Sequence, residues 1–175
     1  MAAKTVAPAL AKKGELLRDK AWARWTALGL LAFAMFCSYV FMDILSPIKN
    51  LLQETRGWDS TAFGTMQGSE TFLNVFVFFL IFAGIILDKM GVRFTAVLSG
   101  AVMLVGACIN WYALTDSFIG SSLDVWFTNH LNYIPGFDEL GVSPFYEGMP
   151  ASAKLSAIGV MIFGCGVEMA GITVS

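Results

Sequence analysis

Residues 84–93 read Gly84-Ile85-Ile86-Leu87-Asp88-Lys89-Met90-Gly91-Val92-Arg93, and a long apolar stretch lies on each side of them. The stretch from Asp59 to Asp88 has Glu70 as its only internal charge, and the stretch at about 94–114 has none. A helix that rises 1.5 Å per residue needs about 20 apolar residues to cross a hydrocarbon layer of about 30 Å. Both stretches are long enough, so the sequence predicts a short polar turn between two membrane-spanning helices.

Two further stretches have the same character. One covers about 25–44 and has no charge until Asp43, and the other covers about 155–175 with Glu168 as its only charge. The whole chain is 57% hydrophobic and 14% charged, with a mean hydropathy of +0.68, which exceeds the apolar share of an ordinary soluble domain. Because lipid offers the backbone no hydrogen bonds and the alternation of barrel strands is missing, helices are expected. The predicted fold is an all-α, polytopic membrane protein with four transmembrane helices.

Lysine and arginine are distributed unequally between the two sides of this predicted bundle. Eight lie on the side of the N-terminus and of the polar turn: Lys4, Lys12, Lys13, Arg18, Lys20, Arg24, Lys89 and Arg93. Three lie on the other side: Lys49, Arg56 and Lys154. Positive loops stay in the cytoplasm, so the N-terminus is expected there, in a multi-pass protein of the bacterial inner (plasma) membrane. The expected organisation is a cytoplasmic arm at 1–20 and a transmembrane domain at 21–175 with a long outer loop at about 115–154.

The composition also argues against several functions. Topology accounts for the positive residues, and basic and aromatic residues are not interleaved, so nucleic acid is not an expected partner. No His, Cys or Asp cluster has the spacing of a metal site, and the single histidine, His130, lies in the outer loop. The sequence therefore predicts neither an enzyme nor a cofactor or metal, and it names the lipid bilayer as a partner.

Three carboxylates occur in the predicted spans, where ionisable groups are costly and usually face a cavity or a partner. Glu168 follows Leu155 by about 20 Å of helical rise, so it is expected deep in the hydrocarbon layer. Asp43 and Glu70 are each about 27 Å from the cytoplasmic boundary and are expected near the outer one. The alternatives are a structural hydrogen bond for Glu168 and interfacial positions in water for the other two.

The second predicted helix has one polar face. Asn74 follows Glu70 by four residues, so the two side chains share a face, and that face is expected to border a central pathway. On the fourth helix, Glu168 shares a stripe with Gly164 and Gly171, which would let another helix or a ligand approach closely. The candidate substrate-binding residues are Glu168, Asp43, Glu70 and Asn74.

The polar turn has the spacing Gly-x-x-x-Asp-(Arg/Lys)-x-Gly-x-Arg, formed by Gly84, Asp88, Lys89, Gly91 and Arg93. This spacing resembles the signature between helices two and three of the major facilitator superfamily. Gly84 is expected to permit close helix contact, Asp88 to face a helix N-terminus or a basic residue, and Gly91 to form a tight turn. The resemblance implies that these five residues gate the cytoplasmic side by latching two halves of a transporter together. The alternative is that the charged residues are solvated flanking groups.

Two further runs narrow the resemblance. Phe163-Gly164-Cys165-Gly166-Val167-Glu168 and Tyr39-Val40-Phe41-Met42-Asp43 resemble the lysosomal dipeptide transporter branch of the superfamily and its prokaryotic relatives. The resemblance implies transport of a small solute by alternating access, with dipeptides or similar small metabolites as substrates and Glu168 as the group that binds the peptide ammonium. It covers about 22–175, the first third of the family's length. The chain is therefore expected to be an N-terminal fragment whose partners are a small-molecule substrate and the remaining helices of the full-length transporter.

Four spans with a large loop between the last two are also typical of a different class of protein, the non-transporting membrane scaffold or organiser, such as a tetraspanin. That class stabilises its large loop with cysteines, whereas residues 115–154 contain none, and Cys37, Cys108 and Cys165 all fall in predicted spans. The transporter is the preferred interpretation, and the scaffold is the alternative.

Overall fold

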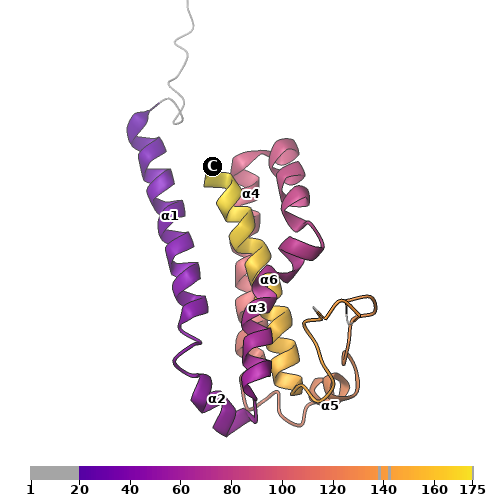
Figure 1. Ribbon diagram of the computed structural model, residues 1–175. Helices are drawn as coiled ribbons and strands as arrows, with labels where there is room; N and C mark the ends of the chain where they lie inside the picture. The colour runs from indigo at the N-terminus through magenta and orange to yellow at the C-terminus, as the bar shows by residue number, and fades with distance from the viewer. Residues whose placement is uncertain (1–19, 138, 142, 175) are drawn as a thin grey trace, which may run out of the picture.

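The computed structural model describes residues 20–137, 139–141 and 143–174 (Figure 1). These residues form helices and no strand, as the predicted all-α class requires. The predicted arm at 1–20 lies outside the described residues, apart from Lys20. The helices are α1 (Ala21–Asp43), α2 (Lys49–Arg56), α3 (Ser60–Phe76), α4 (Phe79–Ala113), α5 (Ser122–Asn129) and α6 (Ala151–Val174).

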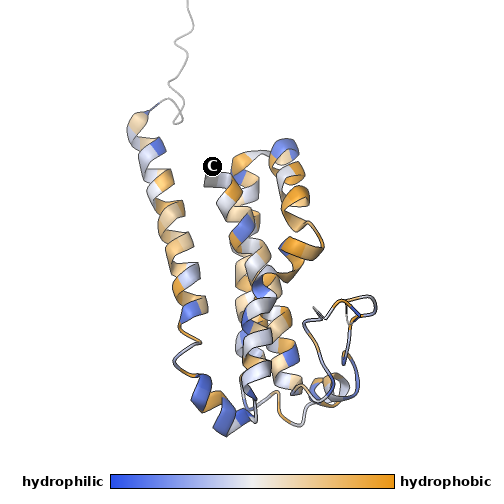
Figure 2. Cartoon of the chain, in the orientation of Figure 1, coloured by the Kyte–Doolittle hydropathy of each residue, from blue (hydrophilic) through white to orange (hydrophobic). Residues whose placement is uncertain are grey.

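Three of these helices are long and apolar enough to cross a membrane. They are α1, α4 and the 151–173 part of α6. Figure 2 shows apolar residues along α1 and α4, whereas the short helix α2 is hydrophilic. The chain is thus a helical membrane protein by length and composition, and the prediction of four spans is corrected to three within the described residues.

The difference arises in the second predicted span, 59–88, which is not one helix. α3 ends at Phe76 and α4 begins at Phe79, and between them Phe78 has φ 54, which is uncommon for a bulky residue. The local run 75–79 consists of valines and phenylalanines. Such side chains lose rotamer freedom in a helix, which weakens the helix at this point. The face predicted to continue from Asn74 to Asp88 is therefore interrupted.

The predicted tight turn at Gly91 is confirmed. Gly91 has φ 81 and ψ 164 inside the α4 range, a conformation that favours glycine. Figure 1 shows the chain reversing at this place, so that 79–90 and 92–113 run in opposite directions. α4 is therefore a helical hairpin, and its second part coincides with the third predicted span.

α6 occupies the centre of the packed region. It passes so close to α4 that a Cβ atom at Gly106 would lie 2.5 Å from the Phe163 backbone nitrogen. A Cβ atom at Gly159 would lie 2.7 Å from the Asn110 nitrogen. Small residues allow this approach, which is the usual way for helices to pack in membranes. α1 instead stands apart from the other helices along most of its length (Figure 1), and Phe41 contacts Phe163 with ring centres 4.9 Å apart.

The two ends of the bundle differ. The start of α1, the Gly91 turn and the end of α6 lie at one end, and α2 and α5 lie at the other (Figure 1). This arrangement has the N-terminal side and the polar turn together, as the predicted topology requires. That this end faces the cytoplasm stays a prediction. The expected outer loop contains α5, and α6 begins at Ala151, so Lys154 belongs to a helix rather than to the loop.

Candidate functional site

The carboxylate of Glu70 lies where α3 crosses α6. A Cβ atom added at Gly164 would approach the Glu70 Cγ atom to 2.9 Å and would meet the Glu70 backbone carbonyl oxygen even more closely. The missing side chain at Gly164 therefore allows α3 to lie directly against α6 at this level. Glu168 is one turn further along the same face of α6, because residues four apart share a helix face.

Two of the carboxylates predicted from the sequence act electrostatically on the third, Glu70. Glu70 is partly buried, and the charges of Glu168 on α6 and Asp43 at the end of α1 both repel it. Glu168 is also partly buried, whereas Asp43 is exposed. Within the described part of the chain none of the three forms an ion pair, since the salt bridge found there joins Arg56 to Asp116. As far as the described residues show, the site is acidic and no cationic side chain is paired with it.

Asn74 adds a neutral polar group to this face of α3. Both polar atoms of its side-chain amide are buried and have no hydrogen-bond partner. Leaving a buried polar group unpaired costs about 1–3 kcal/mol. Side chains in a helix lean towards its N-terminus, so the Asn74 side chain lies over the turn that carries Glu70. The amide has both a donor and an acceptor to offer to a polar ligand.

The structure corrects the predicted depth of Glu70. From the distance to Asp88 it was expected near the outer boundary, but it lies at the level of Gly164, well inside α6. The estimate assumed one continuous helix from Glu70 to Asp88, and the break after Phe76 invalidates that assumption. Asp43 ends α1 and lies closer to the end of the bundle that holds α2 (Figure 1), and that this end is the outer one stays a prediction.

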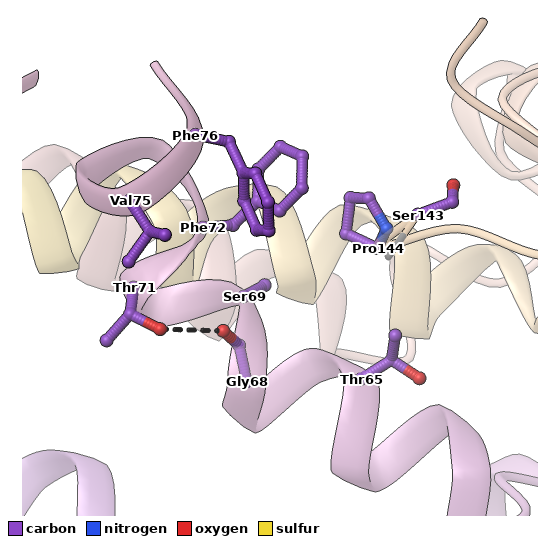
Figure 3. A pocket seen from close by; sticks show the side chains of 9 residues that line it. All are labelled: Thr65, Gly68, Ser69, Thr71, Phe72, Val75, Phe76, Ser143 and Pro144. Carbon is purple, nitrogen blue, oxygen red and sulfur yellow. Dashed lines mark hydrogen bonds between the residues drawn. The ribbon is translucent and has the colours of Figure 1, made fainter. Parts of the chain in front are cut away.

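A pocket that the sequence did not indicate lies beside the opposite face of α3. Its volume is about 230 Å³, and Figure 3 shows Ser143 and Pro144 facing α3 across it. The hydroxyls of Thr65 and Ser143 lie at the same end of the pocket, with phenyl rings at the other. The recurrence of small and hydroxylated residues along α3 is the sequence signal that could have indicated this pocket. The second wall comes from far along the chain, which no local pattern reveals. The lining residues are Thr65, Gly68, Ser69, Thr71, Phe72, Val75, Phe76, Ser143 and Pro144.

The predicted gating residues occupy the hairpin of α4. Asp88, Lys89 and Arg93 are all exposed, and in the residues that the structure describes they make no ion pair. The close helix contact expected at Gly84 is absent, since a Cβ atom there would meet nothing within 4 Å. The break after Phe76 directs residues 79–90 away from α6 (Figure 1), so no neighbouring helix reaches Gly84.

A second polar contact lies at the start of α3. The Tyr146 hydroxyl donates a hydrogen bond of 2.7 Å to Asp59 Oδ1, which also accepts from the Ala62 backbone nitrogen as the N-cap of α3. The hydrogen bond from Tyr146 lowers the pKa of the Asp59 carboxyl below its ordinary value. Burial and the same hydrogen bond raise the pKa of Tyr146. This contact ties the outer connection to α3.

Comparisons of this chain with protein-family models, with curated proteins and with solved structures gave no match. The described residues contain no group of three or more His, Cys, Asp or Glu side chains that could hold a metal ion. The class of protein that the fold defines is therefore a helical membrane protein with an acidic site between α3 and α6.

Proposed function

We propose that this chain is the N-terminal part of a membrane transporter of the major facilitator type, which moves a small solute by alternating access. The observation that carries the proposal is that Glu70 lies against Gly164 where α3 crosses α6, one helical turn from Glu168, and that neither carboxylate forms an ion pair among the described residues. Carboxylates inside a helical membrane protein are costly, and such groups commonly mark the path of a solute or ion.

The chemistry of the site favours a solute that carries a positive group. An ammonium group would relieve the repulsion that Glu168 and Asp43 exert on Glu70. The buried amide of Asn74 would supply an acceptor for a further N–H of the same ligand. Dipeptides and similar small metabolites have such groups, and they are the proposed substrates.

The exposed apolar surface supports the proposed partners. α1 exposes large apolar side chains along its length, among them Trp22, Trp25, Phe33 and Phe36, each more than 60% exposed. In residues 79–90 of α4 the exposed apolar side chains are Leu80, Ile81, Phe82, Ile85 and Met90. In the proposed assembly, lipid and the remaining helices of the full-length transporter cover these surfaces. The Asp88–Arg93 turn would then act as the cytoplasmic gate between the two halves.

The test compares two neutralising substitutions in the full-length transporter. Glu168→Gln removes the charge at the proposed site, and Asp88→Asn removes an exposed charge of the turn. We expect Glu168→Gln to reduce dipeptide binding at least about tenfold, because a charged hydrogen bond contributes about 1.5–3 kcal/mol. Asp88→Asn is expected to slow uptake into liposomes while binding changes little.

Equal losses of binding in the two variants would contradict the role of Glu168. A full-length protein that binds and carries no dipeptide, sugar or organic anion would favour the scaffold instead. A further hypothesis is that the present chain alone does not transport, because a pathway between two halves needs both of them. Solute uptake by liposomes that contain only residues 1–175 would refute that hypothesis.

A further inference from the structure

Lys154 is a buried cation in the first turn of α6. Only 1% of its surface is exposed. Its Nζ atom donates to the Phe127 carbonyl oxygen at 2.8 Å, to the His130 carbonyl oxygen at 3.0 Å and to Asn132 Oδ1 at 2.8 Å. An ammonium group has three donors, so these three acceptors satisfy it completely.

All three acceptors are neutral, and all three come from the connection that precedes α6. Phe127 lies in the last turn of α5 and His130 is its C-cap, so Lys154 satisfies carbonyl groups that have no partner within the helix. The C-terminal end of α5 also carries the negative end of that helix dipole, whereas the start of α6 carries a positive one. The position of the ammonium is therefore explained by α5 and not by its own helix.

The same connection is attached at two other places. We call its described residues, 115–137, 139–141 and 143–150, the outer cap. Near its beginning, Asp116 forms an ion pair of 2.7 Å with Arg56, the last residue of α2. Near its end, Tyr146 donates a hydrogen bond to Asp59 at the start of α3. The cap is thus bonded to three different helical segments.

Apolar packing closes the space between these polar contacts. Phe118 and Phe127 of the cap are buried against Ala151 and Leu155 of α6. Phe137 packs its ring edge against Phe72 of α3, with ring centres 5.2 Å apart. The cap therefore has a core of its own that is continuous with the membrane helices.

We infer that the outer cap is a lid that stays attached to α6 and moves with it as one unit. Lys154 is the positioning residue that holds the cap on α6. A loop that opened as a hinge would break all three hydrogen bonds of the Lys154 ammonium at once and would separate Phe118 and Phe127 from the apolar surface of α6. Movement of the cap therefore requires movement of α6, the helix that carries Glu168.

The test is hydrogen exchange measured by mass spectrometry on the full chain in lipid nanodiscs. In Lys154→Met the ammonium is lost while the apolar stem is retained. We expect backbone exchange in 122–137 to accelerate at least about tenfold, in line with the loss of charged hydrogen bonds. Exchange in the part of α4 that packs on α6, 106–113, is expected to stay unchanged. Lys20→Met, at an exposed position, serves as the matched control and is expected to change neither segment.

A second variant covers the case in which Lys154→Met does not fold. Asn132→Ala removes one acceptor and leaves the lysine in place, so it is expected to accelerate exchange in 122–137 by a smaller factor, about two- to fivefold. Unchanged exchange in that segment in either folded variant would overturn the inference. Equal acceleration in 106–113 and 122–137 would also overturn it, because it would show a general loss of stability and no local clamp.

Discussion

Helices α1 and α6 contain apolar stretches of the same length, 23 residues, and of the same mean hydropathy, yet they have opposite surroundings. In the apolar 18-residue segment of α6, 72% of the residues are buried inside the protein, whereas in that of α1 only 11% are. Hydropathy therefore predicts that a helix can cross a membrane but does not predict which helix forms the centre of the fold.

The two helices differ in the size of their side chains. α6 has glycine at 159, 164 and 166, and at each of these the backbone of a neighbouring helix fills the place of a Cβ atom. α1 has phenylalanine, leucine and tryptophan around its single glycine, Gly29, where a Cβ atom would meet nothing within 4 Å. Because lipid is as apolar as leucine, helices in a membrane associate through close packing, and small residues make it possible.

We expect the largest effect on stability from adding one methyl group at the α4–α6 crossing. This change tests whether close packing is what distinguishes α6 from α1. Gly106→Ala places a Cβ atom 2.5 Å from the Phe163 nitrogen, so α4 and α6 must separate. We expect a loss of about 1–3 kcal/mol, typical of overpacking, measured as a lower midpoint of thermal unfolding in detergent. Gly29→Ala in α1 is the matched control, and its midpoint should stay equal or rise because alanine favours a helix. A fall of similar size in both variants would mean that the close crossing does not stabilise the fold.

A smaller effect is expected from a buried polar contact of the same pair of helices. The Ser156 hydroxyl of α6 donates a hydrogen bond to Asn110 Oδ1 of α4, and both residues are buried. Ser156→Ala leaves the Asn110 oxygen without its partner, which should cost about 1 kcal/mol in the same unfolding assay. The control is Thr26→Ala in α1, where an exposed hydroxyl donates to the Trp22 carbonyl oxygen at 2.9 Å. An equal change in both would show that burial does not distinguish the two helices.

The smallest effect on stability is expected from a change of pH and concerns Asp59 at the start of α3. The pKa of Asp59 is lowered in the folded protein, so its ionised form contributes stability above the ordinary value of 3.8. That contribution is lost as the pH falls through the lower folded pKa. The unfolding midpoint should therefore drop as the pH falls below the ordinary value of 3.8. In Tyr146→Phe, which removes the main cause of the shift, the drop should be smaller. An unchanged drop in that variant would assign the pH dependence to other groups.

Much of the candidate site could be predicted from the sequence, because a polar or charged side chain is energetically costly in an apolar stretch. Glu70, Asn74 and Glu168 are polar in apolar stretches, and such residues are conspicuous whatever the packing. The conformation of Gly91 was also predictable, since a glycine within a short polar run between apolar helices is typical of a reversal. The gating role of that turn stays a prediction.

The depth of Glu70 and the contacts of Lys154 were not predictable in the same way. The depth depended on a helix break at Val77 and Phe78, for which the run contains neither proline nor glycine as a signal. Lys154 was counted as a residue of an outer loop, but it lies in α6 and binds oxygens from residues 22 to 27 positions earlier in the chain. Contacts between such distant residues follow from packing and not from local pattern.

The sequence by itself determined the class of this protein, an all-helical chain of membrane-spanning stretches with a few costly carboxylates, because transfer of each side chain between water and lipid depends on its own chemistry. Only the tertiary structure decided that α6 is the centre, that Glu70 lies against Gly164 one helical turn from Glu168, and that the outer cap is bonded to Lys154. Those outcomes depend on which backbones can approach one another, and that is a property of pairs of helices and not of any one stretch.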